Sequence, residues 1–232
     1  SIIISTFKNT FVLAISSIII AIFLGILMGI FSAINKDNII DKSLLFFSAI
    51  GMSLPSFFSA ILIAWFFGFV LHQYTNLSMI GSLFEIDDYG MGYHLNIKNL
   101  ILPSITLGVR PLSVIIQLSR NSLLDVLNMD YIRTAKAKGL KYSKVLFKHA
   151  LRNSLNPVVT AVSGWFASLL SGAVFVEYVF GWNGLGKEIV NALNTLDLPV
   201  IMGSVLFISI VFIIINLLVD LIYILLDPRI KT

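Results

Sequence analysis

Residues 130–152, DYIRTAKAKGLKYSKVLFKHALR, form a polar and strongly basic segment between two long apolar segments, near 101–124 and 155–176. Three further apolar segments lie near 11–34, 44–71 and 199–226. Each of the five is long enough to cross the hydrocarbon core of a bilayer, which takes about 20 residues in a helix. The sequence therefore predicts an all-α, polytopic transmembrane helical bundle with five spans and a polar loop at about 125–154.

The composition supports this class. The chain is 57% hydrophobic and 12% charged, whereas soluble domains carry roughly 25% charged residues. The apolar segments are continuous and lack the alternation that is typical of barrel strands. We expect residues 1–232 to form a single transmembrane domain.

The same composition argues against enzymatic and metal chemistry. The chain has no cysteine, which excludes disulfides and thiolate metal sites. His72, His94 and His149 are scattered without metal-ligand spacing, and none lies inside a span, where it could serve as a base for Ser163. We therefore predict that the chain is not an enzyme and binds no metal or cofactor.

The segment GWNGLGK at 181–187 has the spacing of a phosphate-binding loop. The following residue is Glu188 rather than the serine or threonine that holds magnesium, and no strand precedes the segment. This segment is predicted not to bind nucleotide, so any ATP must be hydrolysed on another chain.

Lysine and arginine predict the orientation. Most of them, 12 of the 16, fall in one alternating set of loops: Lys36, Lys42, Arg120, Arg133, Lys136, Lys138, Lys141, Lys144, Lys148, Arg152, Arg229 and Lys231. The positive-inside rule places this set in the cytoplasm, with the N-terminus outside and the C-terminus inside. The net charge of +4 is thereby explained by topology rather than by a nucleic-acid partner.

Small residues recur every four positions in the first span, at Ala21, Gly25, Gly29 and Ala33. This spacing places them on one helix face, where small residues allow another helix to approach closely. The pattern predicts a packing partner, either within the chain or across a subunit interface.

Prolines mark the ends and interiors of the spans. Pro103, Pro157 and Pro199 are predicted to open spans, where a missing N–H is harmless. Pro55 and Pro111 lie inside spans and should kink them. Such kinks suit helices that rearrange, although membrane helices also tolerate proline for structural reasons.

Two charged residues near the spans have alternative interpretations. Arg110 is the one basic residue inside a span, where it lines a translocation path or pairs with Asp220 or a carbonyl. Glu177, at an external helix end, is interpreted as solvated in preference to touching a substrate or its carrier.

The polar loop itself predicts two short helices. Asp130 can cap a helix over 131–138, Gly139 can end it in the left-handed conformation, and Ser143 can cap a second helix. The second helix carries an apolar stripe of Val145, Leu146, Ala150 and Leu151. From the residues alone, the loop is equally suited to docking a protein and to binding anionic lipid headgroups.

The run YIRTAKAKGL, followed by HALRNSLNPVV, resembles the cytoplasmic loop of ABC importer permeases, whose consensus is Glu-Ala-Ala, three residues, then Gly. Arg133, Thr134 and Ala135 stand at the Glu-Ala-Ala positions, and Gly139 matches the glycine. The His149–Asn153 run resembles the oligopeptide/dipeptide/nickel branch, as do the runs at 118–120, 125–127, 180–182, 184–186 and 197–199. Such permeases usually have a further N-terminal span and external segment, so we expect this chain to begin after both.

The resemblance implies the core of a type I ABC importer permease that binds no cofactor. ATP and magnesium would bind two partner ATPases, and a second homologous permease and an extracellular substrate-binding protein would complete the importer in a bacterial inner membrane. The 131–151 loop would couple to the ATPases through Tyr131, Arg133, Thr134, Ala135, Ala137, Gly139, Leu140 and Lys141. Arg110, Pro111 and Pro55 are candidates for the translocation path of peptides, nickel or metal chelates.

Two other classes remain as alternatives. An ATP-independent carrier or channel would need inverted repeats or midplane carboxylates, and neither is evident in the sequence. In a structural membrane scaffold, the basic loop would serve only as a lipid anchor.

Overall fold

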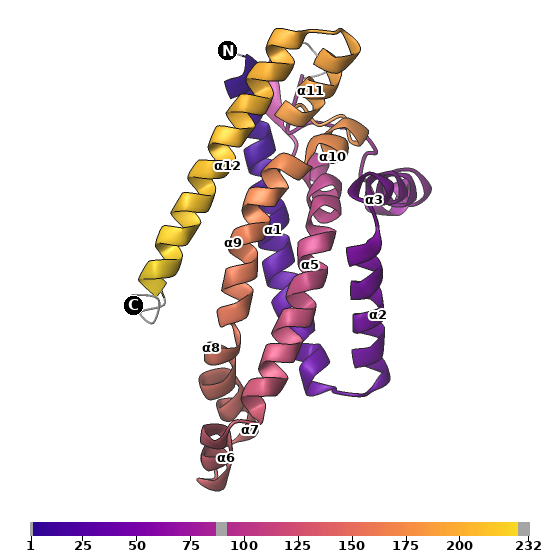
Figure 1. Ribbon diagram of the computed structural model, residues 1–232. Helices are drawn as coiled ribbons and strands as arrows, with labels where there is room; N and C mark the ends of the chain where they lie inside the picture. Colours follow the sequence, from indigo (N-terminus) through magenta and orange to yellow (C-terminus); the bar gives the residue numbers. More distant parts are fainter. Residues whose placement is uncertain (1, 87–91, 227–232) are drawn as a thin grey trace. The chain divides into compact units, whose positions relative to one another are not determined.

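The computed structural model of the protein describes residues 2–86 and 92–226. The described part is almost entirely helical, with two π-helices, η1 and η2, and two short strands (Figure 1). The elements before the loop are α1 (Ile2–Ile34), α2 (Ile39–Ser53), α3 (Ser56–Ile63), η1 (Ala64–Val70), α4 (His72–Thr75), β1 (Phe84–Ile86), β2 (Tyr93–Leu95) and α5 (Lys98–Leu127). Those that follow are α6 (Asp130–Ala137), α7 (Tyr142–Lys144), η2 (Val145–Ala150), α8 (Leu151–Ser154), α9 (Asn156–Gly172), α10 (Val174–Val179), α11 (Leu185–Asn194) and α12 (Leu198–Leu226).

The structure confirms the helical membrane class and refines the expected spans. By length and composition, three of the described helices could each cross a membrane: α1, α5 and residues Leu198–Val219 of α12. The expected 44–71 span is interrupted and becomes α2 followed by α3 and η1, which qualify only as a broken pair. The expected 155–176 span is divided between the 17-residue α9 and the short α10.

Proline accounts for part of this difference. Pro55 does not kink a continuous helix but stands before α3 as its N-cap, with φ −61° and ψ 141°. Pro157 and Pro199 are the second residues of α9 and α12, as expected for helix-opening prolines. Pro103 was wrongly placed at a helix start: α5 begins at Lys98, whose N–H is accepted by the side chain of Asn96.

The chain forms two compact units, each built from separated segments. The first comprises residues 1–19, 54–108 and 164–232. Its interior includes the fully buried Trp182, whose indole Nε1 donates to the carbonyl of Asn9 at 3.1 Å. Phe7 of α1 and Phe207 of α12 meet edge to face at 5.0 Å between ring centroids. Contacts of this geometry add specificity to apolar burial.

A small antiparallel hairpin also belongs to the first unit. β1 pairs with β2 in the register Phe84 with Leu95, Glu85 with His94 and Ile86 with Tyr93. The amide of Asn96 donates to the carbonyl of Leu83 just outside the ladder. This hairpin is a small exception to the all-α prediction, in a segment between two predicted spans.

The second unit comprises residues 20–53 and 109–163. The small-residue stripe of α1 lies here against α5. A Cβ added at Gly25 would meet the side chain of Ile115, and one added at Gly29 would meet the side chain of Ser119 and the carbonyl of Ile116. Ala21 and Ala33 are buried beside them. The partner helix of the stripe is therefore within the chain.

Candidate functional site

The loop between α5 and α9 is a series of short helices. A glycine forms the turn that follows the first of them, α6. Gly139 follows α6 with a φ of +75°. Its amide donates to the carbonyl of Lys136 at 3.0 Å, and the amide of Leu140 donates to that of Ala135 at 3.4 Å. These two bonds are the Schellman pattern that ends a helix. The prediction of a left-handed glycine is confirmed, and it fixes the direction in which the chain leaves α6.

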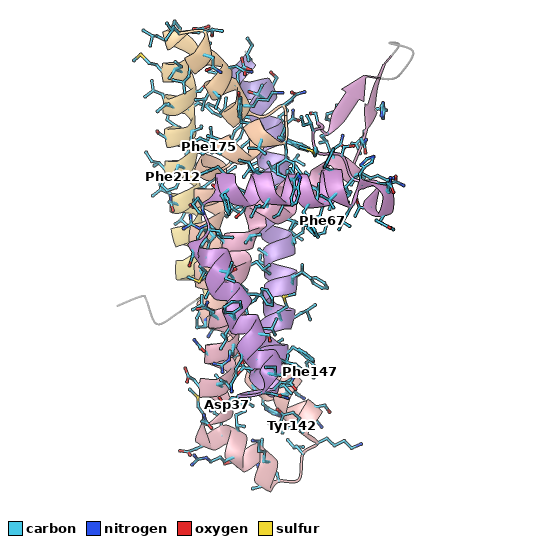
Figure 2. All side chains as sticks on the ribbon, turned by 90° about the vertical axis from the view of Figure 1, so that its right-hand side faces the viewer. Asp37, Phe67, Tyr142, Phe147, Phe175 and Phe212 are labelled. Carbon is cyan, nitrogen blue, oxygen red and sulfur yellow. The ribbon has the colours of Figure 1, made fainter. Side chains whose placement is uncertain are left out.

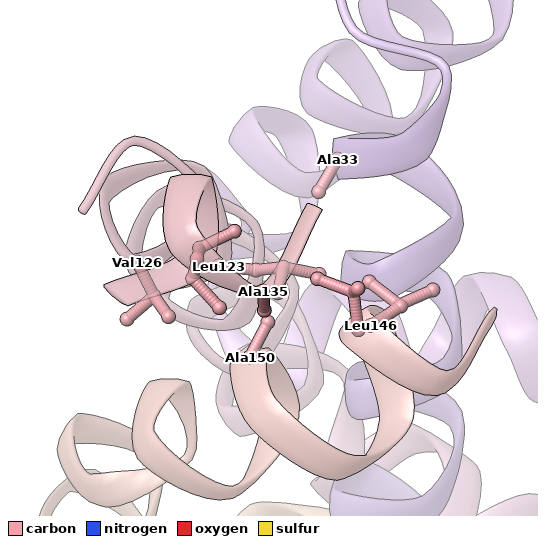
Figure 3. Packing of buried hydrophobic residues seen from close by; sticks show 8 residues of the cluster. Ala33, Leu123, Val126, Ala135, Leu146 and Ala150 are labelled. Atoms are coloured by element: carbon pink, nitrogen blue, oxygen red, sulfur yellow. The ribbon is translucent and has the colours of Figure 1, made fainter. Parts of the chain in front are cut away.

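An apolar cluster holds these short helices together. It contains Leu123 and Val126 of α5, Ile132 and Ala135 of α6, Val145, Leu146 and Ala150 of η2, and Ala33 of α1 (Figure 3). The predicted stripe Val145, Leu146 and Ala150 is buried here, with Leu151 packed against its edge. Burial of this kind stabilises by roughly 25 cal/mol per Å² of apolar surface. The loop is therefore a packed substructure rather than a flexible connection.

The predicted caps are wrong. α6 begins at Asp130 itself, after Met129, and no side chain caps it. Asp130 instead lies 3.4 Å from the exposed guanidinium of Arg133. The second helical segment begins at Tyr142, so that Ser143 lies within it. In both places burial of the apolar face positions the helix without a capping side chain.

The structure separates the predicted coupling residues by their exposure. Tyr131 is 40% exposed, and Arg133, Thr134, Ala137, Gly139 and Lys141 are also at the surface. Leu140 is half-buried. Ala135 lies inside the apolar cluster with only 8% exposure, because it faces Leu123 and η2 rather than solvent. Its small side chain allows the helices of the loop to approach each other.

A buried ion pair lies beside this loop in the same unit. The guanidinium of Arg120 on α5 donates from Nε to Oδ1 and from a terminal nitrogen to Oδ2 of Asp41, both at 2.6 Å. The hydroxyl of Ser32 and the amide of Asp37 also donate to this carboxylate. Paired, charge-assisted bonds of this kind are strong and directional. The arrangement joins the start of α2 to α5, about two turns before α5 ends at Leu127.

This pair was not predicted from the sequence, where Arg120 was counted among the cytoplasmic charges and in the 118–120 run. Asp41 and Arg120 are 79 positions apart. One signal was available: both stand at the edge of apolar segments, where a charge is costly unless it is paired.

The candidates for the translocation path occupy different places. Arg110 is exposed at the middle of α5, and Pro111 beside it is buried. Within the described part of the chain, no carboxylate lies within ion-pair distance of Arg110, and the side chain of Asp220 lies outside the described residues. Pro55 is exposed ahead of α3.

Glu177 is fully buried in the first unit, so its interpretation as a solvated helix end is wrong. Its Oε2 accepts the amide of Gly186 at 2.7 Å and that of Lys187 at 3.2 Å, at the start of α11. A Cβ on Gly184 would collide with the carboxylate, and one on Gly186 with the backbone of Val174. The Gly-Leu-Gly run therefore makes room for a buried acid.

The surroundings of Glu177 raise the pKa of its carboxyl group. Burial raises the pKa of Glu177 to about 7, although the Thr10 hydroxyl and the amides of Lys187 and Gly186 act in the opposite direction. Its second oxygen, Oε1, has no hydrogen-bond partner. A carboxyl group in such a place can bind a proton near neutral pH.

Across residues 2–86 and 92–226, no group of three or more histidine, cysteine, aspartate or glutamate side chains is placed to hold an ion. The geometry found is instead that of a helical membrane component with a packed polar loop.

Comparison with solved structures places the fold in a class. A protein of the MetNI methionine ABC transporter, in an inward-facing conformation, aligns over 95% of this chain and 94% of its own with a TM-score of 0.70 and 16% identity. A chain of an amino acid ABC transporter with histidines aligns over 98% and 94%, with a TM-score of 0.63 and 16% identity. The fold is that of a type I ABC importer permease, which confirms the expected architecture.

Sequence comparison gives the family. Residues 21–232 match the binding-protein-dependent transport system inner membrane component family, and the chain belongs to it. The dipeptide transport system permease protein DppB of Bacillus subtilis is 39% identical over 97% of this chain and 68% of its own length. DppB of Escherichia coli K12 is 35% identical over 97% of this chain and 71% of its own.

These findings define the general role. The chain is a multi-pass membrane component of an importer and not an enzyme. It spans about two thirds of the length of these curated relatives.

Proposed function

We propose that the chain is the permease subunit of an ATP-driven importer of small peptides. The observation that carries this substrate class is the 39% identity, over nearly the whole chain, to a dipeptide permease. Nickel and metal chelates remain the alternative cargo, inferred from the wider resemblance alone. Substrate choice by a separate binding protein would leave the permease residues largely non-selective.

The 131–151 loop is the proposed site of coupling to cytoplasmic ATPases. The packing of the loop supports this proposal. The apolar cluster and the glycine turn make the loop a compact body, and its outer residues remain exposed. A body of this kind can transmit the movement of a partner to α5 and α9, from which it extends (Figure 1). ATP and magnesium would be held by the ATPases.

The proposed assembly contains a second homologous permease, two ATPase subunits and a substrate-binding protein on the outer face. The whole chain would act as one permease domain, because the family match at 21–232 includes segments of both compact units. The distribution of basic residues supports a cytoplasmic loop, with the N-terminus outside and the C-terminus inside.

Alternating access is the proposed mechanism. ATP-driven closure of the ATPases would draw the loops together and open the path outward, provided that the two states differ in packing. Arg110 is exposed within α5 and is proposed to line the path, where it could meet a peptide carboxylate. Pro111 and the helix break at Pro55 are the proposed flexing points.

A crosslinking experiment tests the coupling. The chain has no cysteine, so Lys141→Cys supplies a single reactive thiol on the exposed loop. In native membranes, a bifunctional reagent should capture an ATP-binding subunit, and Gly139→Val should abolish the capture. Capture of lipid alone at normal protein levels would instead favour the scaffold.

A transport measurement separates the remaining alternatives. In vesicles containing the complete importer, uptake of a labelled dipeptide should require ATP and the binding protein. Uptake without ATP would indicate a carrier, and uptake of nickel in place of dipeptide would reassign the cargo.

A further inference from the structure

A polar cleft lies in the loop, away from the Gly139 turn. It has a volume of about 450 Å³ and is lined by five residues: Tyr131 of α6, Lys148 and His149 of η2, and Arg152 and Asn153 of α8. The amide nitrogen of Asn153 donates to the hydroxyl oxygen of Tyr131 at 2.9 Å. This bond joins the two walls of the cleft, so its shape exists before any ligand binds.

The lining is rich in donors and cations. Lys148 offers three N–H groups and Arg152 five, and the Tyr131 hydroxyl hydrogen remains available because its oxygen already accepts from Asn153. Among the described residues, no carboxylate pairs with Lys148 or Arg152, and the nearby Asp130 faces Arg133. A cluster of convergent cationic donors without an acid fits an anion with several acceptor oxygens, such as a phosphate group.

The π-helix contributes to this convergence. η2 is followed without interruption by α8, so Lys148, His149 and Arg152 lie within about one turn of each other. π-Helical turns are uncommon and are often found at functional sites.

The position of the cleft favours a membrane lipid as the source of that phosphate. α8, which carries Arg152 and Asn153, lies directly before the largely apolar α9 (Figure 1). The neighbouring Phe147 and Tyr142 project from the loop, 65% and 52% exposed (Figure 2). Exposed aromatic side chains beside basic ones are typical of elements that lie at the bilayer surface.

We propose that this cleft binds the phosphate group of an anionic membrane lipid. The bound headgroup would hold α6 and α8 together at the membrane surface. Tyr131 would then serve the cleft, and the ATPase contact would be confined to the Gly139 end of the loop. The inference rests on the proposed cytoplasmic interface position of the loop.

Lipid binding to the purified full-length chain tests the proposal. The probe is a fluorescent short-chain phosphatidylglycerol, titrated into detergent-solubilised protein, with phosphatidylcholine of the same chains for comparison. The test variant is Lys148→Gln/Arg152→Gln. Lys136→Gln/Lys138→Gln is the matched control, because it removes two charges from exposed positions of the same loop outside the cleft.

We expect the cleft variant to lose about tenfold or more in affinity for phosphatidylglycerol, because it loses direct hydrogen bonds to a charged phosphate, each of which contributes roughly tenfold. The control variant should stay within about twofold of the unaltered protein, as should phosphatidylcholine binding by both variants. Equal losses in both variants would overturn the proposal in favour of diffuse surface charge. No loss of affinity in either variant would also overturn it, because the cleft cations would then not bind the lipid.

Two further measurements separate other sources of the anion. Displacement of the lipid by millimolar inorganic phosphate would show that the cleft takes a free anion instead. A phosphatidylglycerol with a photoreactive headgroup should label residues 148–153 in the unaltered protein, which requires no variant to fold, and labelling confined to other segments would overturn the proposal.

The result is distinguishable from that of the proposed function. Lys141→Cys can also be introduced into the Lys148→Gln/Arg152→Gln variant. If that protein still binds phosphatidylglycerol but no longer captures an ATPase, the cleft belongs to the ATPase interface and the lipid proposal fails. If lipid binding is lost as expected while no ATPase is captured from any variant, the coupling proposal fails and the lipid site stands.

Discussion

Glu177 shows how one residue determines a local sequence. A buried carboxylate costs free energy unless hydrogen-bond donors surround it, and the first turn of α11 supplies two amides. Those amides reach the carboxylate only because Gly184 and Gly186 carry no side chain. The glycines and the acid therefore form one unit, although nothing in their spacing identifies it.

Protonation of Glu177 should make stability depend on pH. Its pKa of about 7 in the folded chain exceeds the ordinary value of 4.5. The folded state therefore retains a proton that the unfolded state has lost between these values, and stability should fall as pH rises from about 4.5 to 7. The loss is at most about 3 kcal/mol.

Unfolding in detergent at pH 5 and pH 8 checks this dependence. Glu177→Gln should flatten it, because glutamine does not titrate, whereas Glu188→Gln, on the neighbouring helix α11, should leave it unchanged. If the stability of the Glu177→Gln variant falls with pH as steeply as that of the unaltered chain, other groups cause the dependence.

Asp41 provides a second prediction for a single residue. Asp41→Asn leaves the largely buried Arg120 without a counter-charge, and unfolding should become easier by about 3 kcal/mol. The double variant Asp41→Leu/Arg120→Met removes both charges and should recover much of this loss. Thermal unfolding of the three proteins checks both statements, and a double variant as unstable as Asp41→Asn would contradict the explanation by an unpaired charge.

Among the elements, the proposed coupling loop depends on the turn at Gly139. A Cβ there meets no atom within 4 Å, so the cost of substitution comes from the positive φ alone. Gly139→Ala should cost about 1–2 kcal/mol locally and weaken ATPase coupling, and Gly139→Val should have a larger effect.

Gly164→Ala is the matched control, because this helical glycine also has open space around it but no positive φ. ATP hydrolysis stimulated by the binding protein, measured in vesicles, reports coupling. If the two alanine variants are equally impaired, the left-handed turn is not the cause.

Elements were predictable from the sequence to the extent that their causes are local. The long apolar runs indicated α1, α5 and α12, and Gly139 indicated a helix end, because length and backbone conformation act within a few residues. The break at Pro55 was interpreted as a kink, since a proline alone does not say whether the helix resumes after it.

Pairings between distant residues escaped prediction. The Arg120–Asp41 ion pair and the burial of Glu177 depend on which helices meet, and a single sequence does not contain that information. The polar cleft likewise requires α6 and α8 to be joined through Tyr131 and Asn153. The sequence thus predicted a loop of short helices at this place along the chain, but the inner and outer faces of the loop became distinct only in three dimensions.

For the whole molecule, transport in one direction requires a defined orientation in the membrane. The uneven distribution of basic residues supports a cytoplasmic loop and an external α11. Because the chain has no cysteine, single cysteines at the exposed positions Lys144 and Asn191 report the two sides independently.

In intact cells, a membrane-impermeant maleimide should label Asn191→Cys and leave Lys144→Cys unlabelled. After permeabilisation both should react, which shows that the thiol at 144 is present and accessible. The reverse pattern would place the 131–151 loop outside, where it could not reach a cytoplasmic ATPase. Labelling of both positions in intact cells would indicate mixed insertion, and the basic residues would then not determine the orientation of this chain.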